Sequence, residues 1–152
     1  MEESNYAYNL VMNLSYLPDF LQRSILKQRL NEFFFMNNDN QNEIINNALD
    51  VGPSIPFDRF SRLLKTWLIS LTYIKHENRK KILSKYIDEV ISSPQKLIKF
   101  NMDGMIGVFN SLGNSQKRIL IKTIREVITT LKYEQKKRLL LLIPDNMKDY
   151  LI

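Results

Sequence analysis

The feature that most constrains the fold of this chain is the helical spacing of its apolar residues, which continues along almost its whole length. From Phe57 to Leu71 the large apolar side chains recur at the spacing of one helix face. The same spacing returns after His76, where Arg79 and the lysines that follow lie away from the apolar stripe, and again after Ser115. Valine and isoleucine do not alternate with polar residues, so no strand is expected. The pattern predicts an all-α protein.

The expected breaks between helices coincide with proline, glycine and polar residues. Pro18 fits the first turn of a helix, and Ser115 suits an N-cap after a stop at Gly113. Pro94 and Pro144 each interrupt a helical run. The expected helices cover residues 5–16, 18–36, 39–50, 57–74, 76–92, 94–100, 102–111, 116–131, 134–143 and 145–151.

Three stretches of the chain resemble one another, and each contains a helix, a short polar turn and a second helix. They run over residues 24–45, 62–83 and 118–140. The second is displaced by 38 residues from the first, and the third by a further 56 with one extra residue inserted. A two-helix unit cannot bury both of its apolar faces alone, so such units stack. In length and layout the plan resembles HEAT-type helical repeats, and no diagnostic motif of a repeat family accompanies it.

We therefore expect a single all-helical domain over residues 1–152, built from stacked antiparallel helix pairs. Both a HEAT-like helical repeat and an irregular multi-helix bundle fit this description. The helix-pair units are expected at about residues 18–50, 57–92, 94–112 and 115–143, with shorter helices covering the two ends of the stack.

The composition removes most catalytic chemistry. The chain has no cysteine and one histidine, which excludes a thiolate metal site, a cysteine nucleophile and a multi-histidine site within one chain. Phosphate-binding glycine loops and hydrolase or metalloprotease motifs are absent from the sequence. His76, followed by Glu77, is interpreted as a solvated residue near a helix N-terminus. We expect a protein that is not an enzyme, with no catalytic residue, metal site or cofactor.

The sequence also favours a cytoplasmic protein that does not enter a membrane. It begins Met1-Glu2-Glu3-Ser4, which is acidic where a secretory signal is basic. The longest uninterrupted apolar run, from Leu139 to Ile143, is far shorter than the roughly 20 residues that a membrane helix needs.

Charge is distributed unevenly along the chain, whose formal net charge is +6. Residues 1–58 carry a net charge of −5, residues 59–114 a net +6 and residues 115–152 a net +5. Such asymmetry is typical of a surface for nucleic acid or another acidic partner. The candidate polyanion-binding residues are Lys117, Arg118, Lys122, Arg125, Lys132, Lys136, Lys137 and Arg138. Only Tyr133 lies among them, so stacking on single-stranded bases is poorly supported.

The aromatic residues suggest a candidate partner interface that is separate from the basic residues. Phe33, Phe34 and Phe35 are consecutive, and successive helix residues point about 100° apart, so all three cannot face the same side. An exposed phenylalanine in this run would mark a partner interface. Trp67 lies in an apolar stripe and is interpreted as a core residue.

The function expected from these features is that of a non-catalytic interaction or scaffold module that binds another macromolecule, with a protein as the first choice of partner. The alternative is a nucleic-acid-binding protein that uses its basic C-terminal two-thirds. A homo-oligomer is compatible with either function.

Overall fold

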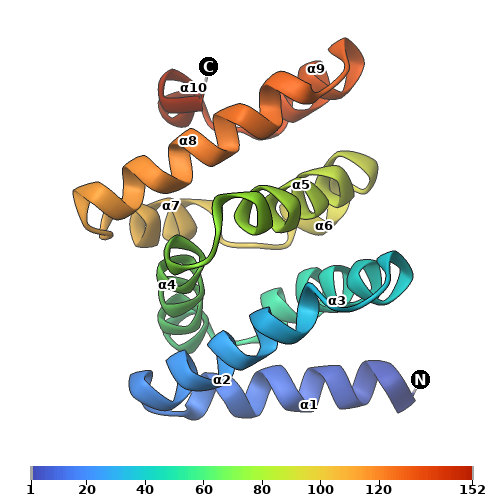
Figure 1. Ribbon diagram of the computed structural model, residues 1–152, viewed down its shortest axis with the longest axis vertical. Coiled ribbons are helices and arrows are strands. Elements are labelled where there is room, and N and C mark those ends of the chain that lie inside the picture. The colour runs from blue at the N-terminus through green and yellow to red at the C-terminus, as the bar shows by residue number, and fades with distance from the viewer. Residues whose placement is uncertain (1, 152) are drawn as a thin grey trace.

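The computed structural model describes residues 2–151, with side chains from residue 9 onward, and this part of the chain is helical without any strand (Figure 1). The all-α prediction is therefore confirmed. The elements are α1 (Glu2–Tyr16), α2 (Asp19–Phe33), α3 (Asn38–Val51), the short 3₁₀ turn η1 (Gly52–Ser54), α4 (Phe57–Tyr73), α5 (His76–Ser92), α6 (Gln95–Ile98), α7 (Met102–Asn110), α8 (Asn114–Thr130), α9 (Tyr133–Leu142) and α10 (Asp145–Leu151).

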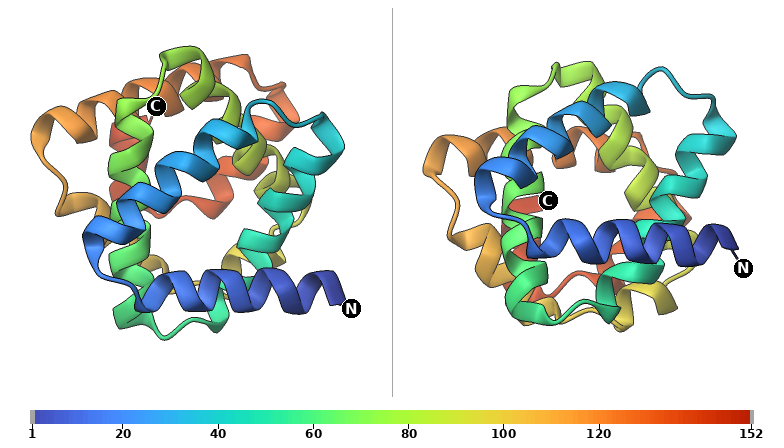
Figure 2. Two further views of the ribbon diagram at one scale, coloured as in Figure 1. Left: turned by 60° about the horizontal axis from the view of Figure 1, so that its bottom comes forward. Right: turned by 90° about the horizontal axis from the view of Figure 1, so that it is seen from below.

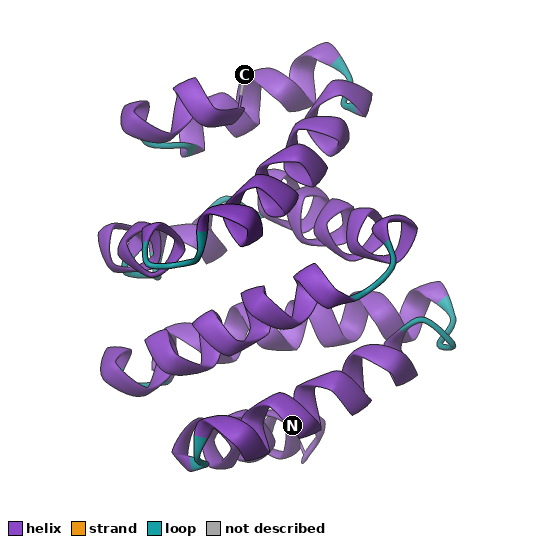
Figure 3. Ribbon diagram, turned by 60° about the vertical axis from the view of Figure 1, so that its left-hand side comes forward, coloured by secondary structure: helices purple, strands orange, loops and turns teal. Residues whose placement is uncertain are grey.

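The helices follow one another along the longest axis of the molecule, with α1 at one end and α8, α9 and α10 at the other (Figures 1 and 3). Helix α4 packs against both α2 and α8, and α5 packs against both α3 and α9. The pairs α2–α3, α4–α5 and α8–α9 are thus consecutive layers, and they contain the three similar stretches of sequence. Seen from below, α4 runs across the direction of α1 (Figure 2). The grouping of all residues into one domain of four units stays a prediction.

A continuous apolar core connects the layers. Its fully buried side chains come from α2, α3, α4, α5 and α8, together with Leu112 before α8. Trp67 packs against this cluster, and its ring meets Tyr86 edge-on with the centroids 5.2 Å apart. The interpretation of Trp67 as a core residue is consistent with this packing. A smaller cluster around Ile128 and Leu139 joins α9 to α8.

Two helix ends differ from the sequence prediction for identifiable reasons. Helix α8 starts at Asn114 and not after Ser115, because Gly113 occupies the N-cap position and its N–H donates to Gln116 Oε1 at 3.0 Å. Helix α2 ends at Phe33 and not at residue 36. The amide of Gln41 donates to the Phe33 carbonyl at 2.8 Å, and the chain leaves the helix through a tight turn.

Candidate functional site

One hydrogen-bonding device recurs where consecutive helices meet. The last carbonyls of a helix have no partner within the helix. This device occurs at the junctions α1–α2, α2–α3 and α4–α5. At each of them the fourth residue of the second helix donates a side-chain N–H to a carbonyl near the end of the first helix, eight residues earlier in the chain. The bonds join Gln22 Nε2 to Leu14 O at 3.1 Å, Gln41 Nε2 to Phe33 O at 2.8 Å and Arg79 Nε to Leu71 O at 2.9 Å. We call these three donors the turn locks.

Two of the turn locks occupy equivalent positions in the first two of the three similar stretches. Arg79 lies 38 residues after Gln41, which is the displacement between the first two similar stretches. The sequence pattern predicts Arg79 on the solvent side of α5, but this prediction is wrong, since the residue is only 7 % exposed. It is buried because its guanidinium serves two carbonyls, those of Leu71 and Ile74, each at 2.9 Å. Burial lowers the pKa of Arg79 from its usual value.

An exposed aromatic residue accompanies each lock. Two residues after each accepting carbonyl stand Tyr16, Phe35 and Tyr73, which are 64 %, 92 % and 80 % exposed. Tyr133, the first residue of α9 after the turn from α8, is 76 % exposed. We call these four residues the turn aromatics. Four of the junctions between helices therefore hold a large ring out in solvent.

The structure separates the three phenylalanines that the sequence grouped as an interface. Phe33 is 3 % exposed and belongs to the core, where its ring meets Phe34 edge-on at 5.2 Å. Phe34 is partly buried against the same cluster. Phe33 is therefore corrected from an interface candidate to a core residue, because its position on the inner face of α2 leaves nothing for a partner to touch. Phe35 is the member of the run that faces solvent.

The eight basic candidates lie on α8, on α9 and in the turn between them. Arg118, Lys122 and Arg125 are exposed and spaced four and three residues apart, which places them on one face of α8. Lys136, Lys137 and Arg138 are consecutive and spread around α9. Among the described side chains, none of the eight forms an ion pair with a carboxylate.

Two carboxylates of this region have other partners. Glu126 Oε2 lies 2.5 Å from His76 Nε2, an interaction that joins α8 to the start of α5. Asp145 accepts a 2.8 Å hydrogen bond from Lys148, which lowers the pKa of that carboxyl. The histidine at the start of α5 thus pairs with a residue 50 positions later in the chain and not with its neighbour Glu77.

Two of the basic candidates have structural contacts. Lys117 Nζ donates to the carbonyl of Asn110, the last residue of α7, at 3.3 Å. Arg125 Nε donates to the carbonyl of Tyr150 at 2.5 Å and so ties α10 to α8. Local sequence patterns predict neither contact, because each depends on where short helices return against α8.

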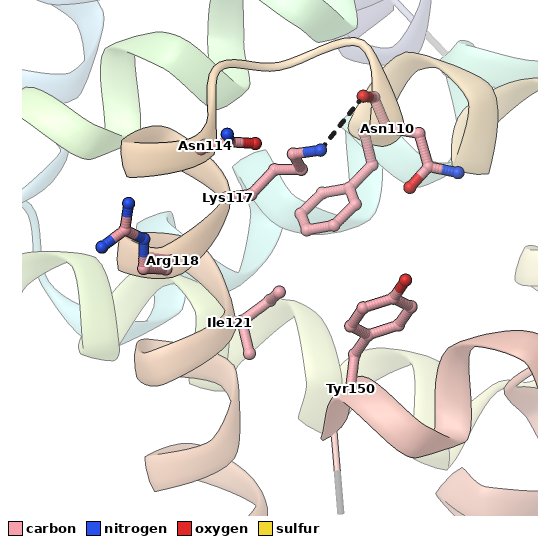
Figure 4. Close-up of a pocket in the computed structure, with 7 residues that line it drawn as sticks. Asn110, Asn114, Lys117, Arg118, Ile121 and Tyr150 are labelled. Atoms are coloured by element: carbon pink, nitrogen blue, oxygen red, sulfur yellow. Dashed lines mark hydrogen bonds between the residues drawn. The ribbon is translucent and has the colours of Figure 1, made fainter.

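A shallow cavity of about 370 Å³ lies between α7, α8 and α10 (Figure 4). Lys117 and Arg118 line it from α8, and Tyr150 lines it from α10. None of the described residues that line it is acidic. No motif in the sequence indicates this cavity, since its walls come from three separate segments.

Metal-ligand clusters and membrane-spanning helices are absent from the described part of the chain. No three His, Asp or Glu side chains there lie close enough together to hold a metal ion. None of the helices in that part has the length and apolarity that crossing a membrane requires.

Comparison with known proteins adds no relative: the chain matches no family model, no curated protein and no solved structure.

Proposed function

We propose that this chain is a non-catalytic helical interaction module that binds another protein through its turn aromatics. The observation that carries the proposal is their placement. Tyr16, Phe35 and Tyr73 occupy the same position relative to the lock of their own helix pair, and all three are largely exposed.

Internal packing gives little reason for Phe35, Tyr73 and Tyr133, which are 92 %, 80 % and 76 % exposed, whereas Tyr16 lies against the Arg59 guanidinium. A turn between helices is usually built from small or polar residues, and Phe35 at 92 % exposure contributes almost nothing to the core. Aromatic side chains are enriched among the residues that supply most of the binding energy in protein interfaces. The locks beside Tyr16, Phe35 and Tyr73 fix the backbone that carries each ring, which reduces the backbone entropy lost on binding.

The test is affinity capture from the native cell extract after nuclease treatment. The variant replaces Phe35, Tyr73 and Tyr133 by serine, and it leaves Tyr16 in place because the Arg59 guanidinium lies 3.7 Å above that ring. The matched control replaces Ile98 and Leu141 by serine, which removes two exposed apolar side chains away from these turns.

The expected result is a protein that the wild type and the control retain and that the turn variant loses. Equal retention by the turn variant would contradict the proposal. Capture that disappears after nuclease treatment would instead favour a nucleic acid as the bound partner.

A nucleic-acid-binding function is the second candidate, and one observation favours it. The eight basic side chains of α8, α9 and their turn form no ion pair with a described carboxylate, so their charge remains available to a polyanion. We propose a cytoplasmic location with either function, and neither function requires a cofactor.

A further inference from the structure

The cavity between α7, α8 and α10 has the dimensions of a small-molecule site. Its volume of about 370 Å³ lies at the lower end of the range of roughly 300–1,000 Å³ that ligand pockets occupy. Residues from three helices line it, so a bound molecule would contact all three segments at once (Figure 4). Phe35 and Tyr73, on which the proposed protein-binding function depends, do not line the cavity, and the cavity requires a different kind of ligand.

One side of the cavity is cationic. Lys117 and Arg118 are consecutive on α8, and both line it. Lys117 donates one hydrogen bond to Asn110 O at 3.3 Å, and a lysine ammonium has further N–H groups to offer. Among the described residues, no carboxylate lines the cavity to neutralise the two charges. Charged donors of this kind suit a phosphate group, because hydrogen bonds between ions are stronger than neutral ones.

Apolar and aromatic side chains form the rest of the lining. Phe109 comes from α7 and Ile121 from α8, and Tyr150 projects from α10 across from Ile121 (Figure 4). The backbone that carries Tyr150 is fixed, because its carbonyl accepts the 2.5 Å hydrogen bond from Arg125. Aromatic side chains at such a position stack on the faces of planar rings.

Two amide side chains complete the lining. Asn110 and Asn114 each offer an N–H donor and a carbonyl acceptor. An amide pairs with the edge of a nucleobase, which also presents donors and acceptors, whereas the ring of a phenyl phosphate presents neither. We propose that this cavity binds a nucleoside monophosphate, with the phosphate at Lys117 and Arg118 and the base against Phe109 and Tyr150.

Titration of the full chain, followed by the backbone amide signals of the cavity residues in two-dimensional NMR, tests the proposal. The probes are adenosine monophosphate, adenosine, inorganic phosphate and phosphotyrosine. The nucleotide is expected to shift these signals with an affinity at least about tenfold higher than that of each other probe, because only the nucleotide uses both sides of the cavity.

Three variants make the result specific. Arg118→Gln and Tyr150→Ser are each expected to weaken nucleotide binding about tenfold, since a charge-assisted hydrogen bond and a stacking contact have similar strength. Tyr150→Ser keeps the carbonyl that Arg125 binds, so α10 stays in place. Lys132→Gln is the matched control, because it removes an exposed positive charge that does not line the cavity.

Four outcomes would overturn the proposal. They are an absence of shifts at millimolar nucleotide, equal affinity for nucleotide and inorganic phosphate, an equal effect of Lys132→Gln and Arg118→Gln, and tighter binding of phosphotyrosine. The second and third would indicate simple attraction of anions, and the fourth would identify a phosphorylated peptide as the ligand. None of them bears on the turn aromatics, so this proposal and the protein-binding proposal fail separately.

Discussion

Replacing Arg79 by methionine tests whether the turn lock stabilises the fold. Methionine keeps most of the apolar stem and removes the guanidinium, so the carbonyls of Leu71 and Ile74 each lose a donor at 2.9 Å. A hydrogen bond from a charged donor contributes about 1.5–3 kcal/mol to stability. Burial of the guanidinium costs desolvation free energy, and the same burial lowers the pKa of Arg79. Methionine avoids this cost, which offsets part of the loss of the two hydrogen bonds. We expect the free energy of unfolding to fall by about 2–4 kcal/mol.

The natural variation among the locks supplies the internal comparison. Gln41 occupies the corresponding position in the preceding helix pair with one donated bond, so Arg79→Gln should cost less than Arg79→Met. Gln41→Met should also cost less, because Gln41 Oε1 is buried without a partner and its removal relieves that penalty. The matched control is Lys81→Met, which removes an exposed cation from the same helix and should change stability by less than about 0.5 kcal/mol.

Urea denaturation followed by circular dichroism at the helical band measures all four variants. The reasoning is refuted if Arg79→Met costs less than about 1 kcal/mol, or no more than Lys81→Met, because a buried carbonyl that loses its donor should cost about 1–3 kcal/mol. A larger loss for Gln41→Met than for Arg79→Met would also reverse the expected order.

Three further predictions concern the core, alkaline stability and the basic helices. Trp67→Ala should lower the free energy of unfolding by about 3–5 kcal/mol in the same urea assay, and a loss below about 1 kcal/mol would show that the ring contributes little packing. Burial raises the pKa of the Tyr86 hydroxyl, so the unfolded chain loses that proton at a lower pH than the folded chain does. The free energy of unfolding should therefore fall as the pH rises above about 10. In Tyr86→Phe this fall should be shallower, and an unchanged dependence of stability on pH would contradict the prediction. If Lys136, Lys137 and Arg138 bind duplex DNA, their joint replacement by glutamine should reduce the slope of log affinity against log salt by up to about 2.7. This figure is about 0.9 for each phosphate that the protein no longer neutralises. An unchanged slope would place the DNA on another surface.

The helices were predictable because local spacing determines them, and the predicted end of α5 coincides with the observed one at Ser92. Helix ends that depend on reciprocal capping were harder to predict from the sequence. Ser115 has the favoured N-cap side chain, yet the glycine two residues earlier takes the position because Gln116 satisfies its N–H.

The candidate sites required tertiary information. Periodicity could state that the phenylalanines of the run face different directions, but only the packing of α2 decides that Phe33 is inside and Phe35 outside. Arg79 has the local pattern of a surface cation, and its burial follows from the carbonyls that α4 presents to it. The cavity depends on the return of α10 against α8, which the sequence does not encode at short range.

The spacing between ring and lock has a consequence for how such a stack can change. At each of three junctions, the exposed ring lies two residues after the accepting carbonyl, and the donor of the turn lock lies eight residues after the same carbonyl. One side chain therefore stabilises the turn, and a different side chain is exposed to solvent. Under the proposed protein-binding function, substitutions at Phe35 or Tyr73 alter recognition at one turn and leave its lock intact. Such a chain can then acquire a new binding partner one turn at a time, and each intermediate sequence still folds.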